Sequence, residues 1–452
     1  MKTKHTLTSI IITFILAASL LLSGCGSQSG QSTNAAASTE AVSVQATAQA
    51  IAGTGNQGAS AAASTAAASA GTAAAQTDSQ NTAAVSDLFT ERDLTQTADL
   101  SSAKTLTLTS GQNLTISEAG VYILSGSAEN ATLIIQAGDE DKVQLVLDGI
   151  TITNTNQPCI LVENADKVFI TSAQGSENTL TVSGAFSGEE DAAVFSRDDL
   201  VLNGLGSVTV TSSKDGIRSN DDLKLTGGSW NIQTTGSALK AHEGIYAWDG
   251  AYTLTAGSDG LHAENNDDDT VGEIRIEGGT FTIQAGDDGI HATTSLTVNG
   301  GTLTITAGEG MEATQLFLNN GSISIQATDD GINAGQKSSA LSIKIEINGG
   351  EISIVMGPGD TDAIDSNGDL AITGGVIQIS AQSPFDYDGQ GSLTGGTVMV
   401  NGTQISSLSN QMMGGPMGGG WGGQPGGQGG QPGGQGGQPG GQGGGPGGGR
   451  RR

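Results

Sequence analysis

The sequence predicts an all-β protein, a right-handed parallel β-helix in which three short strands make each turn of 21–22 residues. Three observations carry this prediction: a five-residue segment that recurs along the chain, strands of alternating aliphatic and polar residues, and a composition poor in helix formers. Gly accounts for 72 of the 452 residues and aromatic residues for only 3%, which favours turns and short strands. Barrels and sandwiches also alternate, but neither predicts so constant a period in one direction.

The recurring segment usually has an acidic residue first, an apolar residue third and a small residue fifth. The third residues follow one another at intervals of 22, 22, 29, 21, 21 and 32 residues, and the two long intervals contain insertions, around 267–269 and 335–342. The seven copies are Asp215–Ser219, Ser237–Ala241, Asp259–Ala263, Asp288–Ala292, Glu309–Ala313, Asp330–Ala334 and Asp362–Ser366.

Two further short strands are expected in each period. One is typified by Ile274–Ile276, which leads into a Gly-Gly turn, and the other by Leu303–Ile305. Their alternation places aliphatic residues on one face and Thr, Ser, Lys or Arg on the other. The stretch 105–210 has the same texture with weaker repetition, so we interpret it as the first turns and a cap. Cys159 lies there and is expected to be a small buried residue.

Four regions are expected along the chain. Residues 1–24 form a signal peptide, 25–86 a disordered tether rich in Ala, Ser, Thr and Gln, 87–408 the β-helix, and 409–452 a disordered tail rich in Gly, Gln and Pro. The net charge of −29 argues against a nucleic-acid partner, because such binding needs a basic surface.

The end of the signal peptide, Leu22-Ser23-Gly24-Cys25, resembles the lipobox of bacterial lipoproteins. This resemblance implies cleavage before Cys25 and lipidation of that residue, which would anchor the protein to the outer face of the cell membrane. The alternative is ordinary secretion with an unmodified Cys25.

Stacking of the turns would align the first residues of the recurring segment in an acidic column. Carboxylates about 5 Å apart repel by roughly 3 kcal/mol at an effective dielectric constant of 20, so protons or cations are needed. Calcium accepts many oxygen ligands with loose geometry. The predicted calcium ligands are Asp215, Asp259, Asp287, Asp288, Glu309, Asp329, Asp330, Asp362 and Asp365. The alternative is that these carboxylates only accept hydrogen bonds from backbone amides in turns.

The fourth position of the segment is expected to point outward and changes from basic to acidic along the chain. Its residues are Arg218, Lys240, His262, His291, Glu312, Asn333 and Asp365. The two histidines suggest a zinc site, but no third ligand has a suitable spacing, so we interpret them as surface histidines.

A second outward column runs along the next strand and combines cations with aromatic rings. Rings cover the apolar face of sugars, and cations pair with uronate carboxylates. The predicted carbohydrate-binding residues are Lys224, Tyr246, Trp248, Arg275 and Phe317. The alternative is that Tyr and Phe are present only because they favour strands.

Together these motifs resemble the clostridial carbohydrate-binding parallel β-helix family. The resemblance rests on repeats such as Asp288–Ala292, on Gly-Gly-Thr-Leu-Thr-Ile strands, on the closing segment Phe385–Gly389 and on the Met/Gly-rich tail. It covers about residues 90–405 and implies a pectate-lyase-like fold, bound calcium, and binding of cellulose and acidic sugars such as polygalacturonate. The protein would then be a monomeric polysaccharide-binding lipoprotein of the cell surface.

Two other functions stay open. A calcium-dependent lyase of the pectate type would remove the proton next to a uronate carboxylate, with Lys240 or Arg218 as the base. The scarcity of basic residues argues against it, so we predict a protein that is not an enzyme. A surface adhesin or scaffold, the third possibility, needs no such site.

Overall fold

The computed structural model describes residues 88–358 and 361–410. Cys25, the predicted signal peptide and tether, and nearly all of the predicted tail lie outside these residues. The described part is all-β, and its helix α2 (Glu91–Leu94) has only four residues. Within this part, no helix has the length and apolar character needed to span a bilayer.

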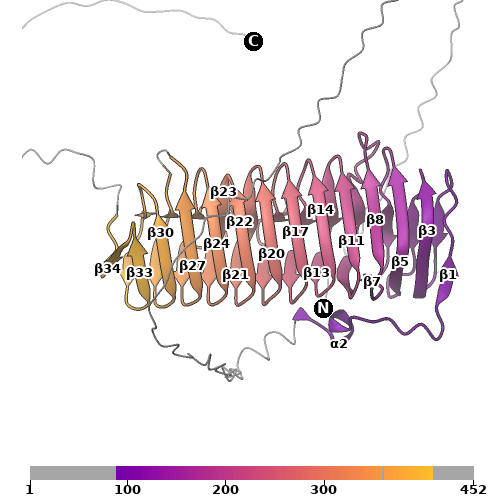
Figure 1. The fold of residues 1–452 in the computed structure, drawn as a ribbon, viewed down its shortest axis with the longest axis horizontal. Helices are drawn as coiled ribbons and strands as arrows, with labels where there is room; N and C mark the ends of the chain where they lie inside the picture. Colours follow the sequence, from indigo (N-terminus) through magenta and orange to yellow (C-terminus); the bar gives the residue numbers. More distant parts are fainter. Residues whose placement is uncertain (1–87, 359–360, 411–452) are drawn as a thin grey trace, which may run out of the picture. The chain divides into compact units, whose positions relative to one another are not determined.

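The strands form three stacks that run along the long axis of Figure 1. Stack 1 holds the recurring segment and comprises β2 (Leu114–Ile116), β4 (Leu133–Gln136), β6 (Ile160–Asn164), β9 (Ala192–Ser196), β12 (Asp215–Ser219), β15 (Leu239–Ala241), β18 (Leu261–Ala263), the first halves of β21 (Asp288–Val298) and β23 (Glu309–Leu318), β25 (Ile332–Ala334), β28 (Ile364–Ser366) and β31 (Asp386–Tyr387).

Stack 2 follows it in each repeat. It comprises β1 (Lys104–Leu106), the first halves of β3 (Gly120–Glu129) and β5 (Lys142–Asn154), β7 (Lys167–Ser172), β10 (Asp199–Gly204), β13 (Asp222–Leu225), β16 (Gly244–Ala247), β19 (Glu273–Ile276), the second halves of β21 and β23, β26 (Lys344–Ile347), β29 (Asp369–Ile372) and β32 (Gly391–Leu393).

Stack 3 closes each repeat. It comprises the second halves of β3 and β5, β8 (Glu177–Val182), β11 (Ser207–Ser212), β14 (Ser229–Thr234), β17 (Ala251–Ala256), β20 (Thr280–Ala285), β22 (Thr302–Ala307), β24 (Ser322–Ala327), β27 (Glu351–Met356), β30 (Val376–Ser380) and β33 (Thr397–Val400). The last strand, β34 (Thr403–Ile405), pairs antiparallel with β33.

Successive strands of a stack pair in parallel, and the register confirms the alignment predicted from the recurring segment. Ile217 pairs with Leu239, Leu239 with Leu261, and Leu261 with Ile290. The insertions that lengthen two intervals therefore leave the strand register unchanged.

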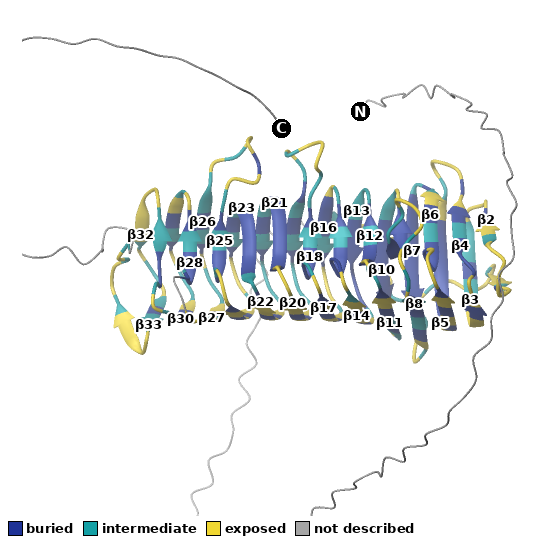
Figure 2. Cartoon of the chain, turned by 90° about the horizontal axis from the view of Figure 1, so that it is seen from above, coloured by how far each residue is buried: buried dark blue, intermediate teal, exposed yellow. Residues whose placement is uncertain are grey.

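The core consists of ladders of buried aliphatic side chains between the stacks. Each fully buried Leu or Ile contributes about 1.5–3 kcal/mol through the hydrophobic effect. Trp230, Tyr252 and Phe281 occupy one ladder of stack 3, on the strands β14, β17 and β20 that Figure 2 colours by burial, and the rings of Tyr252 and Phe281 stack 4.8 Å apart. Cys159 is buried as expected, and burial raises the pKa of its thiol to about 12.

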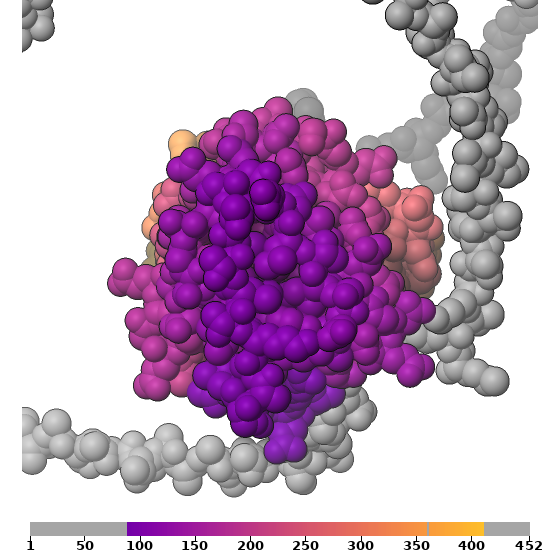
Figure 3. All heavy atoms as spheres, turned by 90° about the vertical axis from the view of Figure 1, so that its right-hand side faces the viewer, coloured from indigo at the N-terminus to yellow at the C-terminus, as the bar shows by residue number. Residues whose placement is uncertain are grey.

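The Gly-Gly turns before the stack 3 strands are required by backbone geometry. Gly301 has a φ of +89°, which L side chains rarely adopt, and a Cβ there would lie 2.8 Å from the carbonyl oxygen of Gly279. Figure 3 looks onto the end that carries the first strands, where side chains fill the end face.

Candidate functional site

The acidic residues of the recurring segment lie one above another along stack 1. The hydroxyl of Ser237 donates to Oδ2 of Asp259 at 3.1 Å, and the amide of Asp288 donates to Oδ1 of Asp259 at 3.2 Å. Asp288 in turn pairs in register with Glu309. The predicted acidic column is therefore present.

Several of these carboxylates accept a hydrogen bond from the backbone of the next repeat. Oδ1 of Asp215 accepts from the amide of Ser237 at 3.0 Å, and Oδ1 of Asp330 accepts from the amide of Asp362 at 3.1 Å. The turn-stabilising role considered as an alternative is thus observed at Asp215, Asp259 and Asp330. A carboxylate has two oxygens and several lone pairs, so this role leaves room for a cation.

The two histidines at the fourth position are largely covered rather than exposed. The imidazole Nδ1 of His262 lies 2.6 Å from Oδ2 of Asp259, and only 12% of the His262 side chain is exposed. The prediction of surface histidines is therefore wrong, because each imidazole turns back over the carboxylate three residues before it.

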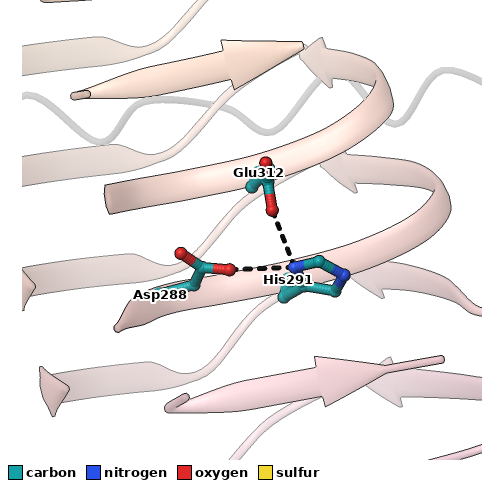
Figure 4. Close-up of side chains that lie close together, drawn as sticks. All are labelled: Asp288, His291 and Glu312. Atoms are coloured by element: carbon teal, nitrogen blue, oxygen red, sulfur yellow. Dashed lines mark hydrogen bonds and ion pairs between the residues drawn. The ribbon is translucent and has the colours of Figure 1, made fainter. Parts of the chain in front are cut away.

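His291 lies between carboxylates of two repeats, as Figure 4 shows. Its Nδ1 is 2.8 Å from Oδ2 of Asp288 and 2.9 Å from Oε2 of Glu312. Lys337 pairs with the other oxygen of Glu312 at 2.6 Å. Two cations thus face two carboxylates, and the cluster is balanced in charge.

The electrostatics of His291 follow from this arrangement. Burial disfavours its charge, but the hydrogen bonds to Asp288 and Glu312 outweigh burial and raise the pKa of His291 to about 10. The rings of His262 and His291 stack 4.8 Å apart. Asp288, His291 and Glu312 have ligand atoms within 4.8 Å of one another and could hold a metal ion, but this group does not include His262. It is therefore not the zinc site considered for the two histidines.

Further along the column, Glu309, Asp330 and Asp365 have other carboxylates as neighbours. Burial and neighbouring carboxylates raise the pKa of Glu309 to about 7, of Asp330 to about 6 and of Asp365 to about 7. Asp365 pairs in register with Asp386, whose buried Oδ1 has no hydrogen-bond partner among the described residues. This stretch has negative charge to be neutralised.

The other predicted calcium ligands lie beside these carboxylates. Asp287 and Asp329 precede Asp288 and Asp330 in the same turns. Burial is the main cause of the raised pKa of Asp330; a backbone hydrogen bond from Asp362 lowers this pKa, and the carboxylate of Asp329 raises it. Asp362 accepts a hydrogen bond from the hydroxyl of Ser383.

Lys224, predicted to bind sugar, is buried beneath the segment that contains α2. Its Nζ donates to the carbonyl oxygen of Leu88 at 2.6 Å and lies 3.9 Å from Oδ2 of the buried Asp93. Lys224 is therefore not exposed as a sugar-binding residue would be, because a segment more than a hundred residues earlier in the chain covers it.

The other predicted carbohydrate-binding residues keep some exposure. Tyr246 pairs in register with Arg275, which forms an ion pair with Glu277. Trp248 is 38% exposed and packs edge-to-face against Phe89. Phe317 has the Nζ of Lys344 4.6 Å from its ring centre.

The two candidate bases of a lyase differ in their surroundings. Arg218 already pairs with Asp191 at 3.0 Å, contacts His242 and lies over the ring of Phe195. Lys240 lies in register between Arg218 and His262. An arginine held in an ion pair is poorly suited to accept a proton, so Lys240 is the stronger candidate of the two.

Sequence reasoning missed two groups. Glu312 could have been found, because it occupies the fourth position one repeat after His291. The acidic cluster of Asp221, Asp222 and Glu243, at the turns before β13 and β16, has ligand atoms within 4.8 Å of one another. It has no counterpart in the recurring segment, and so the repeat gave no signal for it.

Comparison with known proteins gives one family. The family described as "Carbohydrate-binding domain-containing protein" matches residues 110–360. A protein of Acetivibrio thermocellus with the same description is 34% identical over 131 residues, which are 27% of this chain and 46% of that protein. The chain therefore spans less than half the length of this relative.

One solved structure is similar to this chain, and the similarity covers 45% of this chain and 85% of the other chain. It is described as the polysaccharide lyase-like protein from C. thermocellum, gadolinium derivative, with a TM-score of 0.43 and 32% sequence identity.

Proposed function

Because this chain belongs to the family of carbohydrate-binding domain-containing proteins, we propose that it is a polysaccharide-binding protein of the cell surface. The family match over residues 110–360 is the observation that carries the proposal. The binding domain would be a right-handed parallel β-helix. Parallel pairing of equivalent residues in successive repeats of 21–22 residues supports this architecture.

The proposed ligands are cellulose and acidic polysaccharides such as polygalacturonate. For the acidic polymers, the second column offers rings and a cation: Tyr246, Arg275 and Phe317 are half-buried, and Trp248 is exposed. Lys224 is left out of this proposed site because it is buried.

Calcium is proposed to bind the part of the acidic column in which carboxylates lie next to carboxylates. The candidate ligands there are Glu309, Asp330, Asp362 and Asp365. Their carboxylate oxygens suit a hard cation. Burial and repulsion from Asp330, Asp386 and Asp362 raise the pKa of Asp365 to about 7. The ion would stabilise this end of the domain and would keep its surface from repelling acidic sugars.

The proposed location is the outer face of the cell membrane, with lipid attached at Cys25. The motif Leu22-Ser23-Gly24-Cys25 supports this proposal. Replacing Cys25 by Ser should release the protein into the medium, and a variant still in the membrane fraction would contradict the anchor.

A pull-down tests the binding function. Full-length protein is mixed with insoluble cellulose or calcium pectate, with and without a chelator, and the retained fraction is measured. Retention on either polymer supports the proposal, whereas retention on neither polymer favours the adhesin alternative. Ultraviolet absorbance of unsaturated uronates in the supernatant would instead identify a lyase, and Lys240→Ala should then abolish it.

A further inference from the structure

On the outward side of stack 3, two rows of uncharged side chains, polar except for Val355, form what we call the hydroxyl face; the exposed Glu351 lies beside them on β27. In Figure 1 its strands lie side by side, from β11 to β30. One row contains Thr209, Asn231, Thr253, Thr282, Thr304, Ser324, Ser353 and Gln378. A parallel row two residues further on contains Thr211, Gln233, Thr255, Gln284, Thr306, Gln326, Val355 and Ser380.

The two rows are aligned without a register slip. Thr253 pairs with Thr282, Thr282 with Thr304, and Thr304 with Ser324. Neighbouring strands lie about 4.8 Å apart and residues two apart on one strand about 6.6 Å apart, so the side chains form a flat lattice. Thr has restricted χ1 freedom, and the residues between these rows are buried aliphatics, which makes the lattice rigid.

The hydroxyl face differs from the rest of the described surface in charge. Neither row contains an acidic or basic residue, although the chain has a net charge of −29. The side chains are exposed, apart from the half-buried Thr179 and Thr181 on β8 that extend the rows and the half-buried Thr209 and Ser353 within them. None of the row side chains hydrogen-bonds to another described residue, so their donors and acceptors face solvent.

We propose that the hydroxyl face binds the flat surface of an insoluble neutral polysaccharide, in which extended chains lie side by side. This inference rests on the proposed function and assigns its ligand class and its binding face. Hydroxyl and amide groups donate to and accept from sugar hydroxyls, and Thr methyl groups contact the C–H groups of the rings. Many weak contacts made at once by one rigid surface add up to firm binding.

The absence of charge from the two rows decides between neutral and acidic polymers. A polyuronate brings a carboxylate on every sugar, and the hydroxyl face offers it no cation. A neutral glucan needs no cation, and its binding would not require any charged side chain of the face to lose water. The flatness of the lattice also suits an ordered surface better than a single chain held in a cleft.

The test uses the full-length protein and microcrystalline cellulose. In Thr282→Lys/Thr304→Lys, two long charged side chains stand at the centre of the face. We expect the retained protein to fall by at least about tenfold, the change that loss of roughly one hydrogen bond's free energy produces. The matched control is Thr115→Lys, an exposed threonine on β2 of stack 1, which should be retained like the unchanged protein.

A second variant separates shape from chemistry. Thr253→Val/Thr304→Val keeps β-branched side chains and therefore the strand, but removes two hydroxyl groups. It should lower retention less than the lysine variant and leave the melting temperature unchanged. Equal melting temperatures of all variants show that a loss of retention is not a loss of folding.

Each outcome decides the assignment. Retention lost only in the hydroxyl-face variants supports it. If retention is lost only in Tyr246→Ala/Arg275→Ala, the assignment of the binding face is wrong, although the protein still binds polysaccharide. Retention on pectate but not on cellulose would also overturn the assignment and leave the proposed function standing. If the unchanged protein binds no polymer, the proposed function itself fails. If that protein instead arrests the growth of ice crystals, the face matches ordered water, which also overturns the assignment.

Discussion

Two stretches of the same acidic column neutralise their carboxylates in different ways. Around His262 and His291, each carboxylate of the column contacts an imidazole, and Lys337 completes the balance. From Glu309 to Asp365, carboxylates face carboxylates and their pKa values rise. The comparison teaches that one repeated backbone tolerates stacked acids in two ways, either by a built-in cation or by a bound proton or ion.

The largest effect is expected from removal of the built-in cation. His291→Ala leaves the buried Asp288 without its cation and Glu312 with Lys337 alone, which should reduce the free energy of unfolding by about 3–5 kcal/mol. Thermal or urea unfolding measures it. Glu264→Gln, which alters only the half-exposed partner of His262, is the control and should cost far less. A loss of less than about 1 kcal/mol in His291→Ala would mean that this cluster does not stabilise the column.

The second effect is that of calcium on the other stretch. At a calcium concentration about 100 times its dissociation constant, binding should add about 2.7 kcal/mol to stability. Asp330→Asn/Asp365→Asn should abolish the calcium-induced rise in melting temperature. Asp148→Asn, an exposed acid on β5 outside the column, should keep that rise. An equal rise in all three proteins would place the ion elsewhere.

The third effect is a pH dependence that falls in different pH ranges in the two stretches. The folded pKa values of Glu309, Asp330 and Asp365 lie above their ordinary values, so their favourable contribution is present below about pH 4 and is lost as the pH rises through about 7. His291 also has a raised pKa, but its contribution persists until the pH approaches about 10.

Without calcium, stability should therefore fall between about pH 5 and pH 8, by an amount of order 1 kcal/mol after allowance for partial exposure. Urea unfolding at both pH values measures the change. Asp330→Asn/Asp365→Asn should flatten the dependence, and calcium should do the same in the unchanged protein. A steeper fall in the double variant would contradict the interpretation.

Much of the site could be predicted because the repeat carries it. The interval of 21–22 residues places Asp259 over Asp288 whatever the rest of the chain does, since a parallel register joins equivalent residues. The direction of the fourth-position side chains could not be predicted in this way. Alternation predicts exposed side chains, but the attraction of an imidazole to a nearby carboxylate holds His262 and His291 against Asp259 and Asp288, where they are largely covered.

Lys224 shows a second kind of limit. Its position on β13 follows from the repeat, but its burial depends on residues 88–93, which have no repeat pattern and contact it across 136 residues of sequence. The ion pairs of Asp93 with Lys167 and Lys224 hold that segment in place. A pattern read along one strand contains no information about such a distant segment.

The all-β class, the period, the strand register and the rows of equivalent residues follow from the amino-acid sequence alone, because alternation and spacing are local properties present in every repeat. Tertiary structure alone decided which rows meet, which carboxylates receive a cation and which lysine is covered. These outcomes depend on contacts between side chains of different repeats and of the N-terminal segment, whose geometry is set only when the chain has folded.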